Sequence, residues 1–417
     1  MSFVKWFYPG MGVKRWLFLL LGGITFLSLG IAYLLVTLYR QQPLPEIFYY
    51  VTLQFIPRLY RGLLFGLVGS TMVVIATIQL NRSLLSAFHM PAQSTLADIV
   101  YRHRSRHRGP KIVAIGGGTG LSTLLRGLKE HTANLTAIVT VADDGGSSGR
   151  LRRRLGVLPP GDFRQCLTAL AEAEPLMSQL FEYRFSEESG LDGHSFGNLF
   201  IVAMSGITGN FEGALSGSSQ VLAVRGRILP STLQNVVLSA ELVNEAIVHG
   251  ESQVPHGGAA IQRVFLRPSD ALAYPDAVSA ILEADLIVVG PGSLYTSVLP
   301  NLLVGDITKA IRASRALKVY ICNVATQPGE TDGYTLGDHI RAIYRHVGDG
   351  LFHCVLANDH FTPFIPPQWG VSAVRLDDLL PNSGLRVVAA NVVDEARPTR
   401  HDPRKLARSL LQLYYER

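Results

Sequence analysis

Residues 111–128 read KIVAIGGGTGLSTLLRGL, and this stretch decides the fold. Its first five residues are a compact apolar run that predicts a buried strand, and leucines then recur at helical spacing from Leu121 to Leu128. Between the two patterns lie four glycines and a threonine, Gly116–Gly120. A strand, a glycine-rich loop and a helix in this order are typical of the first unit of a Rossmann-like sheet.

The same alternation returns along the rest of the chain. Further buried strands are predicted at Leu135–Ala142, Asp285–Val289 and Lys318–Val324. A helix is expected to begin at Asp162, with Gln165 as its capping-box partner, and a closing amphipathic helix at Asp402–Tyr414. Val236–Val254 alternates weakly and predicts an inserted β-hairpin. We therefore expect residues 111–417 to form an α/β, Rossmann-like, doubly wound and mostly parallel sheet.

Two uncharged stretches precede this domain, at Trp16–Tyr39 and Gly62–Leu80. As a helix the first would be about 36 Å long, enough to cross a hydrocarbon core of ~30 Å, and the second is near the minimum spanning length. The first is too long for the apolar part of a cleaved signal peptide, and a second stretch follows it. Residues 1–90 are therefore expected to be a membrane anchor with two transmembrane helices, at about residues 16–39 and 62–80.

Basic residues flank these stretches unevenly. Three arginines lie between them: Arg40, Arg58 and Arg61. The side that would hold both termini has Lys5, Lys14, Arg15, Arg82, Arg102, Arg104, Arg106, Arg108 and Lys111. The positive-inside rule then places both termini and the main domain in the cytoplasm. Residues 91–110 form a basic linker that could attract anionic lipid or nucleic acid, and the nearby spans favour lipid, so no nucleic-acid partner is expected.

Overall composition says little about the ligand. The 417 residues carry a formal net charge of +6 and a mean hydropathy of +0.23, but both the charge and the apolar excess are concentrated towards the N-terminus. The three cysteines, Cys166, Cys322 and Cys354, have no metal-binding spacing. We expect them to be small buried side chains in a reducing compartment.

The glycine loop after the first strand predicts a phosphate site. Glycines let the backbone approach a ligand, and the following helix N-terminus supplies N–H groups that attract an anion. Leu121 replaces the third glycine of the dinucleotide fingerprint, and no Gly-Lys pair follows as in a Walker A loop, so neither NAD nor that loop type is favoured. A tight turn without a ligand is the alternative. The candidate ligand-binding residues are Gly117, Gly118, Thr119, Gly120 and Ser122.

A second polar loop, DDGGSSGR at Asp143–Arg150, follows the second strand. In Rossmann topology it lies beside the glycine loop, where acidic side chains hold ribose hydroxyls or a divalent metal such as Mg²⁺. Arg150, Arg152, Arg153 and Arg154 place cations beside the same pocket; a solvated turn is the alternative. Candidate ligand-binding residues are Asp143, Asp144, Ser147, Ser148, Gly149 and Arg150. Asp143 and Asp144 are also the candidate metal ligands and candidate catalytic residues.

The segment GHSFGN at residues 193–198 matches the G-x-S-x-G nucleophile pattern. That motif requires a buried strand immediately before the serine, whereas the preceding SEESGLD is polar and turn-like. A serine hydrolase is therefore not favoured. We expect instead a loop entering a helix, with Ser195 and Asn198 directed at the ligand and His194 in either a structural or a functional role.

Two further loops follow predicted strands. Gly290–Ser297 (GPGSLYTS) forms another glycine- and serine-containing turn before a helix, with Gly292 and Ser293 as candidate ligand-binding residues. The loop after the strand at residues 318–324 contains Glu330 and Asp332, which either bind ligand hydroxyls or face water. Because the carboxyl ends of parallel strands share one edge, these loops together predict one long crevice for an extended, phosphate-containing molecule.

Taken in order, six segments resemble the gluconeogenesis factor family, which is homologous to 2-phospho-L-lactate transferase. They are IGGGTGLS (Ile115–Ser122), VTVADDGGSSGRLR (Val139–Arg152), LPPGDFRQCL (Leu158–Leu167), GHSFGNLF (Gly193–Phe200), GPGSLYTSVLPNLL (Gly290–Leu303) and CNVATQPGETDGYT (Cys322–Thr335). The likeness extends over residues 111–417. The chain departs from the family at Gln165, where asparagine is usual, and in its N-terminal anchor, since many relatives are cytosolic.

The resemblance implies a regulatory protein that binds nucleotide sugars such as UDP-N-acetylglucosamine and acts on central carbon metabolism, cell shape and peptidoglycan precursor supply. It also implies an alternative, a Mg²⁺-dependent transferase of phospholactyl or phosphoryl groups. In those relatives the aspartates matching Asp143 and Asp144 lie near acceptor and metal. A third alternative is a structural partner protein at the membrane with a degenerate ligand site. Domains of this kind commonly self-associate, so a homo-oligomer is expected.

Overall fold

The computed structural model describes residues 13–41, 47–51, 53–86, 109–172, 175–186, 190–191, 193–362, 364–377 and 384–416. The chain divides into two compact units, Met1–Ser105 and Arg106–Arg417, and each is described by itself. Most of the basic linker expected at residues 91–110 lies outside the described residues, so that prediction stays untested.

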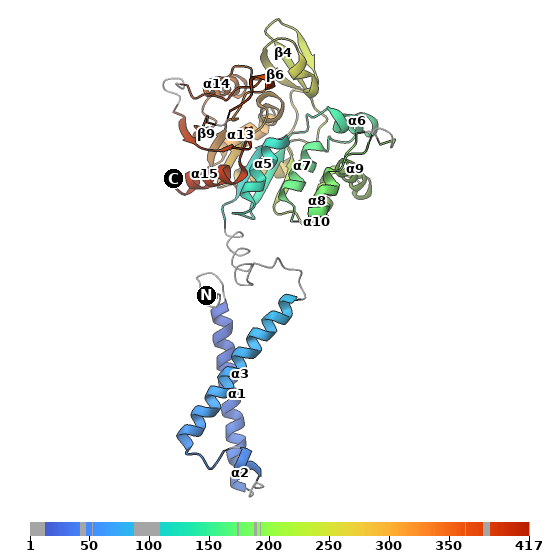
Figure 1. Ribbon diagram of the computed structural model, residues 1–417. Helices are drawn as coiled ribbons and strands as arrows, with labels where there is room; N and C mark the ends of the chain where they lie inside the picture. The colour runs from blue at the N-terminus through green and yellow to red at the C-terminus, as the bar shows by residue number, and fades with distance from the viewer. Residues whose placement is uncertain are drawn as a thin grey trace. The chain divides into compact units, whose positions relative to one another are not determined.

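The first unit consists of helices. They are α1 (Val13–Gln41), α2 (Ile47–Val51) and α3 (Arg58–Ser86) (Figure 1). The spans expected at residues 16–39 and 62–80 fall on α1 and α3. Among the described residues, however, no helix combines the length and the apolar character that crossing a membrane requires.

The second unit is built on a seven-stranded sheet in which every pairing is parallel. Its strands are β1 (Ile112–Gly116), β2 (Leu135–Val139), β3 (Arg227–Pro230), β7 (Leu286–Val289), β8 (Leu317–Ile321), β9 (Cys354–Asn358) and β10 (Arg386–Ala390). The order β10-β9-β8-β7-β1-β2-β3 means that the chain builds outward from β1 in one direction and from β7 in the other. The predicted α/β sheet is confirmed, with its topological switch point between β1 and β7.

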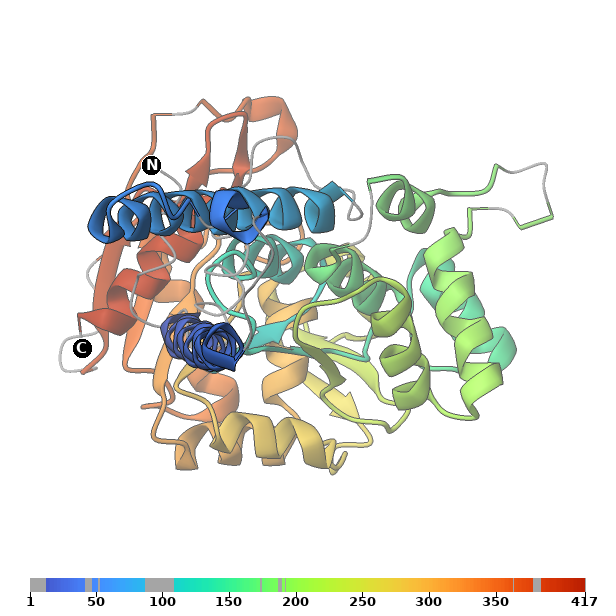
Figure 2. The ribbon, with the colours of Figure 1, turned by 90° about the horizontal axis from the view of Figure 1, so that it is seen from below.

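Helices cover both faces of this sheet. Figure 2 shows α5 (Gly118–Leu128), α7 (Gly161–Leu170) and α15 (Pro403–Tyr415) on one side and α11 (Pro275–Leu282) and α13 (Gly305–Ala313) on the other. The remaining helical elements are α6 (Gly146–Leu155), α8 (Pro175–Glu182), α9 (Phe196–Thr208), α10 (Phe211–Val221), η2 (Glu251–His256), η3 (Leu294–Val298), α12 (Leu299–Leu302), α14 (Leu336–Val347) and η4 (Pro367–Trp369). Strand side chains buried on both faces explain why these strands read as continuous apolar runs.

Two small antiparallel sheets complete the domain. The inserted hairpin is present, but it belongs to a three-stranded sheet of β4 (Val237–Leu242), β5 (Ile247–His249) and β6 (Ile261–Arg267). The prediction stopped at Val254 because the η2 turn interrupts the alternation before β6. The edge of β6 is covered by α14, since His346 Nε2 accepts the Val264 N–H at 2.9 Å. The second sheet pairs β11 (Val393–Asp394) with β12 (Arg397–His401), and the sequence did not predict it.

The predicted capping box at Asp162 and Gln165 is wrong. Helix α7 begins at Gly161, and no side chain caps it. The Gln165 side chain instead accepts a hydrogen bond from Thr119 Oγ1 at 3.3 Å, which links α7 to the glycine loop. The C-terminal helix is confirmed: Asp402 caps α15 by accepting from the N–H groups of Arg404 and Lys405. All three cysteines are buried and free, as expected.

Replacing Gly127 with alanine should destabilise the domain. Helices α5 and α15 touch at this glycine, where a Cβ would lie 2.0 Å from the Pro403 carbonyl oxygen. We expect Gly127→Ala to cost about 1–3 kcal/mol of unfolding free energy through overpacking. Gly206→Ala in α9 is the matched control, because nothing lies within 4 Å of its Cβ and helix propensity alone should stabilise it by roughly 0.5–1 kcal/mol. Urea unfolding measures both variants, and equal unfolding free energies for Gly127→Ala and Gly206→Ala would contradict the packing described.

Candidate functional site

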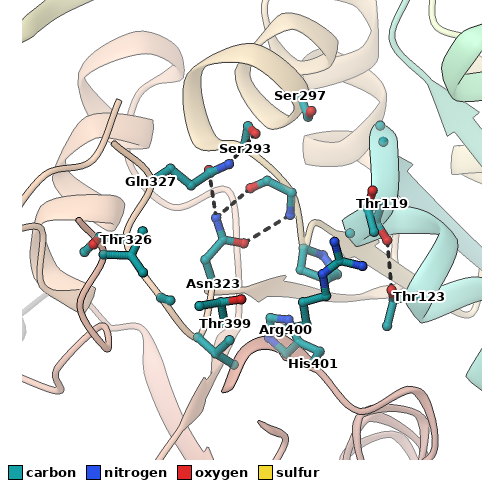
Figure 3. Close-up of a pocket in the computed structure, with 18 of the residues that line it drawn as sticks. Thr119, Thr123, Ser293, Ser297, Asn323, Thr326, Gln327, Thr399, Arg400 and His401 are labelled. Carbon is teal, nitrogen blue, oxygen red and sulfur yellow. Dashed lines mark hydrogen bonds between the residues drawn. The ribbon is translucent and has the colours of Figure 1, made fainter. Parts of the chain in front are cut away.

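A cavity of about 480 Å³ opens at the switch point, above the carboxyl ends of β1, β7 and β8 (Figure 3). Four parts of the chain line it. They are the glycine loop with Thr123, the loop after β7 (Pro291, Gly292, Ser293 and Ser297), the loop after β8 (Asn323–Pro328), and a C-terminal part (Trp369, Val371, Thr399, Arg400 and His401). The cavity therefore lies where open α/β sheets bind their ligands.

Backbone rather than side chains forms the floor of this cavity. A Cβ on Gly117 would lie 2.5 Å from Asp162 Oδ2, and one on Gly120 would lie 2.4 Å from the Pro291 carbonyl oxygen. Gly118 has φ +59°, a left-handed conformation that suits glycine. Four candidate residues, Gly117 to Gly120, therefore line the cavity as the sequence suggested. Ser122 does not, because it is buried and donates its hydroxyl to the Thr119 carbonyl at 3.0 Å.

Side-chain amides hold the loop after β7. Asn323 Oδ1 accepts the Gly292 N–H at 3.2 Å, and Asn323 Nδ2 donates to the Gly292 carbonyl at 2.9 Å. Gln327 Nε2 donates to Ser293 Oγ at 2.6 Å (Figure 3). Gly292 and Ser293 were predicted as site residues and do line the cavity. Asn323 and Gln327 were missed, because their segment was read only for its carboxylates.

The cavity contains a cation that the sequence did not reveal. Arg400, at the end of β12, is the only arginine or lysine among the described lining residues, and no described residue accepts a hydrogen bond from it. Figure 3 shows its guanidinium between Asn323 and Thr119. The neighbouring His401 is buried against the Cys322 carbonyl at 3.2 Å, and burial lowers its pKa to about 4. Positive charge in the cavity therefore comes from Arg400.

The aspartate loop lies on the other side of the glycine loop and does not line this cavity. Asp143 Oδ1 accepts the Gly145 N–H, and Asp144 Oδ1 accepts the Ser252 N–H, both at 2.9 Å. Ser148 hydrogen-bonds to the Asp143 carboxyl. Arg152 donates to the carbonyls of residues 141–143 at the end of β2, so this cation secures the loop. The backbone of Gly149 packs on the Asp144 carbonyl, and Arg150 approaches Gly193.

Partly buried carboxyls lie beside the glycine loop on that side. Asp162 is half-buried beneath the loop and accepts the Gly118 N–H; desolvation and the nearby Asp143 raise its pKa to about 7. Burial and neighbouring carboxylates likewise raise the pKa of Glu251 to about 8 and raise that of Asp143. A divalent cation would offset this crowding of negative charge. No three histidine, cysteine or acidic side chains among the described residues form a metal-binding group, so Mg²⁺ at Asp143 and Asp144 stays a prediction.

Ser195 and Asn198 lie in a buried network outside the cavity. Ser195 caps α9 by accepting the Asn198 N–H at 3.3 Å. The Asn198 amide donates to Ser147 Oγ at 3.0 Å and accepts from Arg164 Nε at 3.1 Å, while Ser147 also contacts His194 at 2.9 Å. These residues attach the aspartate loop to α7 and α9. Among the described residues just before Ser195 (190–191 and 193–194) none belongs to a strand, in keeping with the expectation that this is not a nucleophile elbow.

The acidic residues after β8 are not directed into this cavity. Glu330 is buried and accepts the Tyr295 N–H at 3.3 Å and the Thr296 hydroxyl at 3.1 Å, so it secures the start of η3. Burial raises its pKa to about 7. Asp332 accepts the Gly329 N–H at 2.7 Å within its own turn. Glu330 therefore does not face water, one of the two roles considered for it, and ligand contact by Glu330 or Asp332 stays a prediction.

Comparisons with known proteins agree with this architecture. The family model for 2-phospho-L-lactate transferase CofD matches residues 112–393. A relative from Nostoc sp. is 48% identical over 98% of this chain and 92% of its own length. The gluconeogenesis factor of Bacillus subtilis is 48% identical over 74% of this chain and 99% of its own length. The crystal structure of a UPF0052 family protein from Bacillus halodurans is similar, with TM-score 0.68 and 47% identity, over 73% of this chain and 99% of that one.

Glu330→Gln should change how stability depends on pH. The folded chain keeps the Glu330 proton up to about pH 7, whereas the ordinary glutamate pKa is 4.5. The stability that this group contributes is therefore fully present below about pH 4.5 and is lost as pH rises through about 7. We expect the variant to gain about 1–3 kcal/mol relative to the wild type between about pH 5 and pH 8. Urea unfolding of both proteins at pH 5 and pH 8 measures this gain. If the difference in unfolding free energy between Glu330→Gln and the wild type is the same at both pH values, the prediction is wrong.

Proposed function

Because the chain belongs to the gluconeogenesis factor family, we propose that it is a regulatory protein whose cavity binds a nucleotide sugar such as UDP-N-acetylglucosamine. The observation that carries the proposal is the position of Arg400, which lies opposite the glycine loop in one cavity and has no acceptor among the described residues. A guanidinium and an open helix N-terminus on facing walls are the two features that bind phosphate most strongly in proteins.

Donors in the cavity match a diphosphate. Helix α5 begins at Gly118 and has no N-terminal side-chain cap, so its first N–H groups remain for a ligand apart from that of Gly118, which Asp162 accepts. Ser293 and Ser297 add hydroxyls on the opposite wall. Two linked phosphates could bridge the glycine loop and Arg400, and each would gain charge-assisted hydrogen bonds.

The cavity also has room and hydrogen-bonding groups for the base and the sugars of a nucleotide sugar. A volume of about 480 Å³ falls within the range of roughly 300–1,000 Å³ that is common for small-molecule sites. Trp369 lies at the rim with 52% of its surface exposed, and an indole there offers a face on which a nucleobase can stack. The lining carries amides and hydroxyls besides, which suit sugar and base hydrogen bonding. These features favour a nucleotide sugar over a simple phosphate.

The regulatory role rests on the family. Its resemblance implies control of central carbon metabolism, cell shape and peptidoglycan precursor supply, and a nucleotide sugar that feeds wall synthesis would report on that supply. The alternative is a Mg²⁺-dependent transferase of phospholactyl or phosphoryl groups, which the match to the transferase model favours. Metal-dependent consumption of a bound nucleotide donor, lost in Asp144→Asn, would support that alternative.

Arg400→Ala should weaken ligand binding strongly. Loss of a charged donor to phosphate costs about 2 kcal/mol, which corresponds to roughly a 30-fold weaker affinity for UDP-N-acetylglucosamine. Arg397→Ala is the matched control, because Arg397 lies on the same strand and does not line the cavity. Isothermal titration calorimetry would measure both variants. Equal affinities for wild type and Arg400→Ala would rule out this cavity as the phosphate site.

We also propose that the N-terminal helices hold the protein at a membrane, with both termini and the main domain on the cytoplasmic side. Apolar side chains on α1 and α3 are exposed in large number, among them Phe26 at 79% and Leu34 and Leu67 at 72% each. Exposed apolar surface of this extent marks a site of interaction with protein or membrane. Basic residues before α1 and after α3 would favour an anionic inner leaflet.

Membrane attachment should depend on those helices. We expect the full chain to stay with sedimented membranes after washes in high salt and in alkaline carbonate, because apolar burial is insensitive to both. The fragment of residues 106–417 should remain in the supernatant. Release of the full chain by salt alone would indicate an electrostatic attachment and contradict the proposal.

A further inference from the structure

The orientation of the Asn323 side chain is fixed by the backbone. Its Oδ1 faces the Gly292 N–H at 3.2 Å, and its Nδ2 faces the Gly292 carbonyl at 2.9 Å (Figure 3). A backbone N–H can only donate and a carbonyl can only accept, so the opposite orientation of this amide would place two donors and two acceptors face to face. Asn323 therefore presents its second N–H in a known direction.

That direction determines the orientation of Gln327. Asn323 Nδ2 is 3.4 Å from Gln327 Oε1, which must be the oxygen because its neighbour is a donor. The other end of the same amide, Nε2, then faces Ser293 Oγ at 2.6 Å. Gln327 can only donate at this atom, so it occupies a lone pair of the serine oxygen. The Gly292 backbone thus fixes the orientation of Asn323, Asn323 fixes that of Gln327, and Gln327 therefore donates to Ser293.

The consequence concerns the Ser293 proton. A hydroxyl has one proton and two lone pairs, and one lone pair of Ser293 Oγ accepts the hydrogen bond from Gln327 Nε2. No described residue accepts a hydrogen bond from Ser293 Oγ, although this residue lines the cavity. Two other hydroxyls nearby use their protons within the protein: Thr123 donates to the Thr119 carbonyl at 2.8 Å, and Thr296 donates to Glu330 at 3.1 Å. The Ser293 O–H is left to donate to a ligand.

We infer that Gln327, oriented by Asn323, is a positioning residue that makes Ser293 a hydrogen-bond donor to an anionic oxygen of the ligand. The inference rests on the proposed nucleotide-sugar site and adds a rule of specificity to it. This wall of the cavity favours groups that only accept, such as phosphate oxygens. A sugar hydroxyl at the same point would gain less, because an anionic acceptor makes the stronger bond.

Gln327→Glu tests the inference with almost no change in shape. The ionised carboxylate that this variant carries accepts from Ser293, so it reverses the serine hydroxyl and removes the donor. We expect the affinity of the full chain for UDP-N-acetylglucosamine to fall at least tenfold at pH 7.5. Towards pH 5 the protonated carboxyl can again donate to Ser293 and accept from Asn323, so the loss should shrink. Arg400 and His401 line the same cavity and can affect binding in every variant. The affinity of each variant is therefore compared with that of the wild type at the same pH.

A second background separates this effect from simple charge repulsion. In Ser293→Ala, which should itself bind about tenfold more weakly, Gln327→Glu should cost clearly less than it does in the wild type. The uncharged Gln327→Met should lose only a few-fold, at every pH, and should add nothing in the Ser293→Ala background. If Gln327→Glu costs the same with and without Ser293, charge alone explains the loss and the inference is wrong.

The outcomes also distinguish this inference from the proposed function. If the wild type binds no nucleotide sugar between pH 5 and pH 8, the proposed function fails, and the inference fails with it. If the wild type binds and Gln327→Glu binds equally well at pH 7.5, the proposed function stands and only the role of Gln327 is overturned. Should Gln327→Glu fail to fold, the variants Gln327→Met and Ser293→Ala still test the inference. If the double variant loses as much binding free energy as the two single variants together, Gln327 does not act through Ser293 and the inference is wrong.

Discussion

Close backbone contact between the loop after β1 and the loop after β7 is the constraint on which the site depends. The two loops meet at Gly120, where a side chain would collide with the Pro291 carbonyl. Asn301 bridges them from below, since its amide donates to the carbonyls of Gly116 at 2.9 Å and Ser297 at 2.8 Å. Because these contacts bring the loops together over the switch point, the cavity has a rigid floor made of main chain.

Local patterns were enough to predict the architecture but only half of the site. Apolar runs next to glycine loops identify parallel strands and the turns that follow them, so the first glycine loop, Gly292 and Ser293 were found. Arg400 and Trp369 belong to segments without such a pattern, and only the three-dimensional fold brings them to the cavity. Ser195 and Asn198 show the converse: a polar motif before a helix predicted ligand contacts, whereas both residues are buried and lie outside this cavity, so their role as ligand-binding residues stays a prediction.

The glycine loop separates two chemically different regions. On one side Arg400, hydroxyls and amides line an open cavity. On the other, Asp143, Asp162 and Glu251 lie close together and partly buried, and their pKa values are raised. Asp162 touches the loop itself through the Gly118 N–H. A ligand that binds the loop from the cavity is therefore in electrostatic contact with the carboxyls behind it, which links the two regions through a single turn of main chain.

The position of Arg400 also bears on how the protein is made. All seven strands of the main sheet are complete by residue 390, so the sheet and the glycine loop can assemble while the chain is still being synthesised. The cation arrives ten residues later, on a strand that leads directly into α15, and α15 packs on α5, the helix that the glycine loop begins. If Arg400 binds phosphate as proposed, ligand binding requires the finished polypeptide, and a chain terminated after β10 would contain all seven strands of the sheet but lack Arg400.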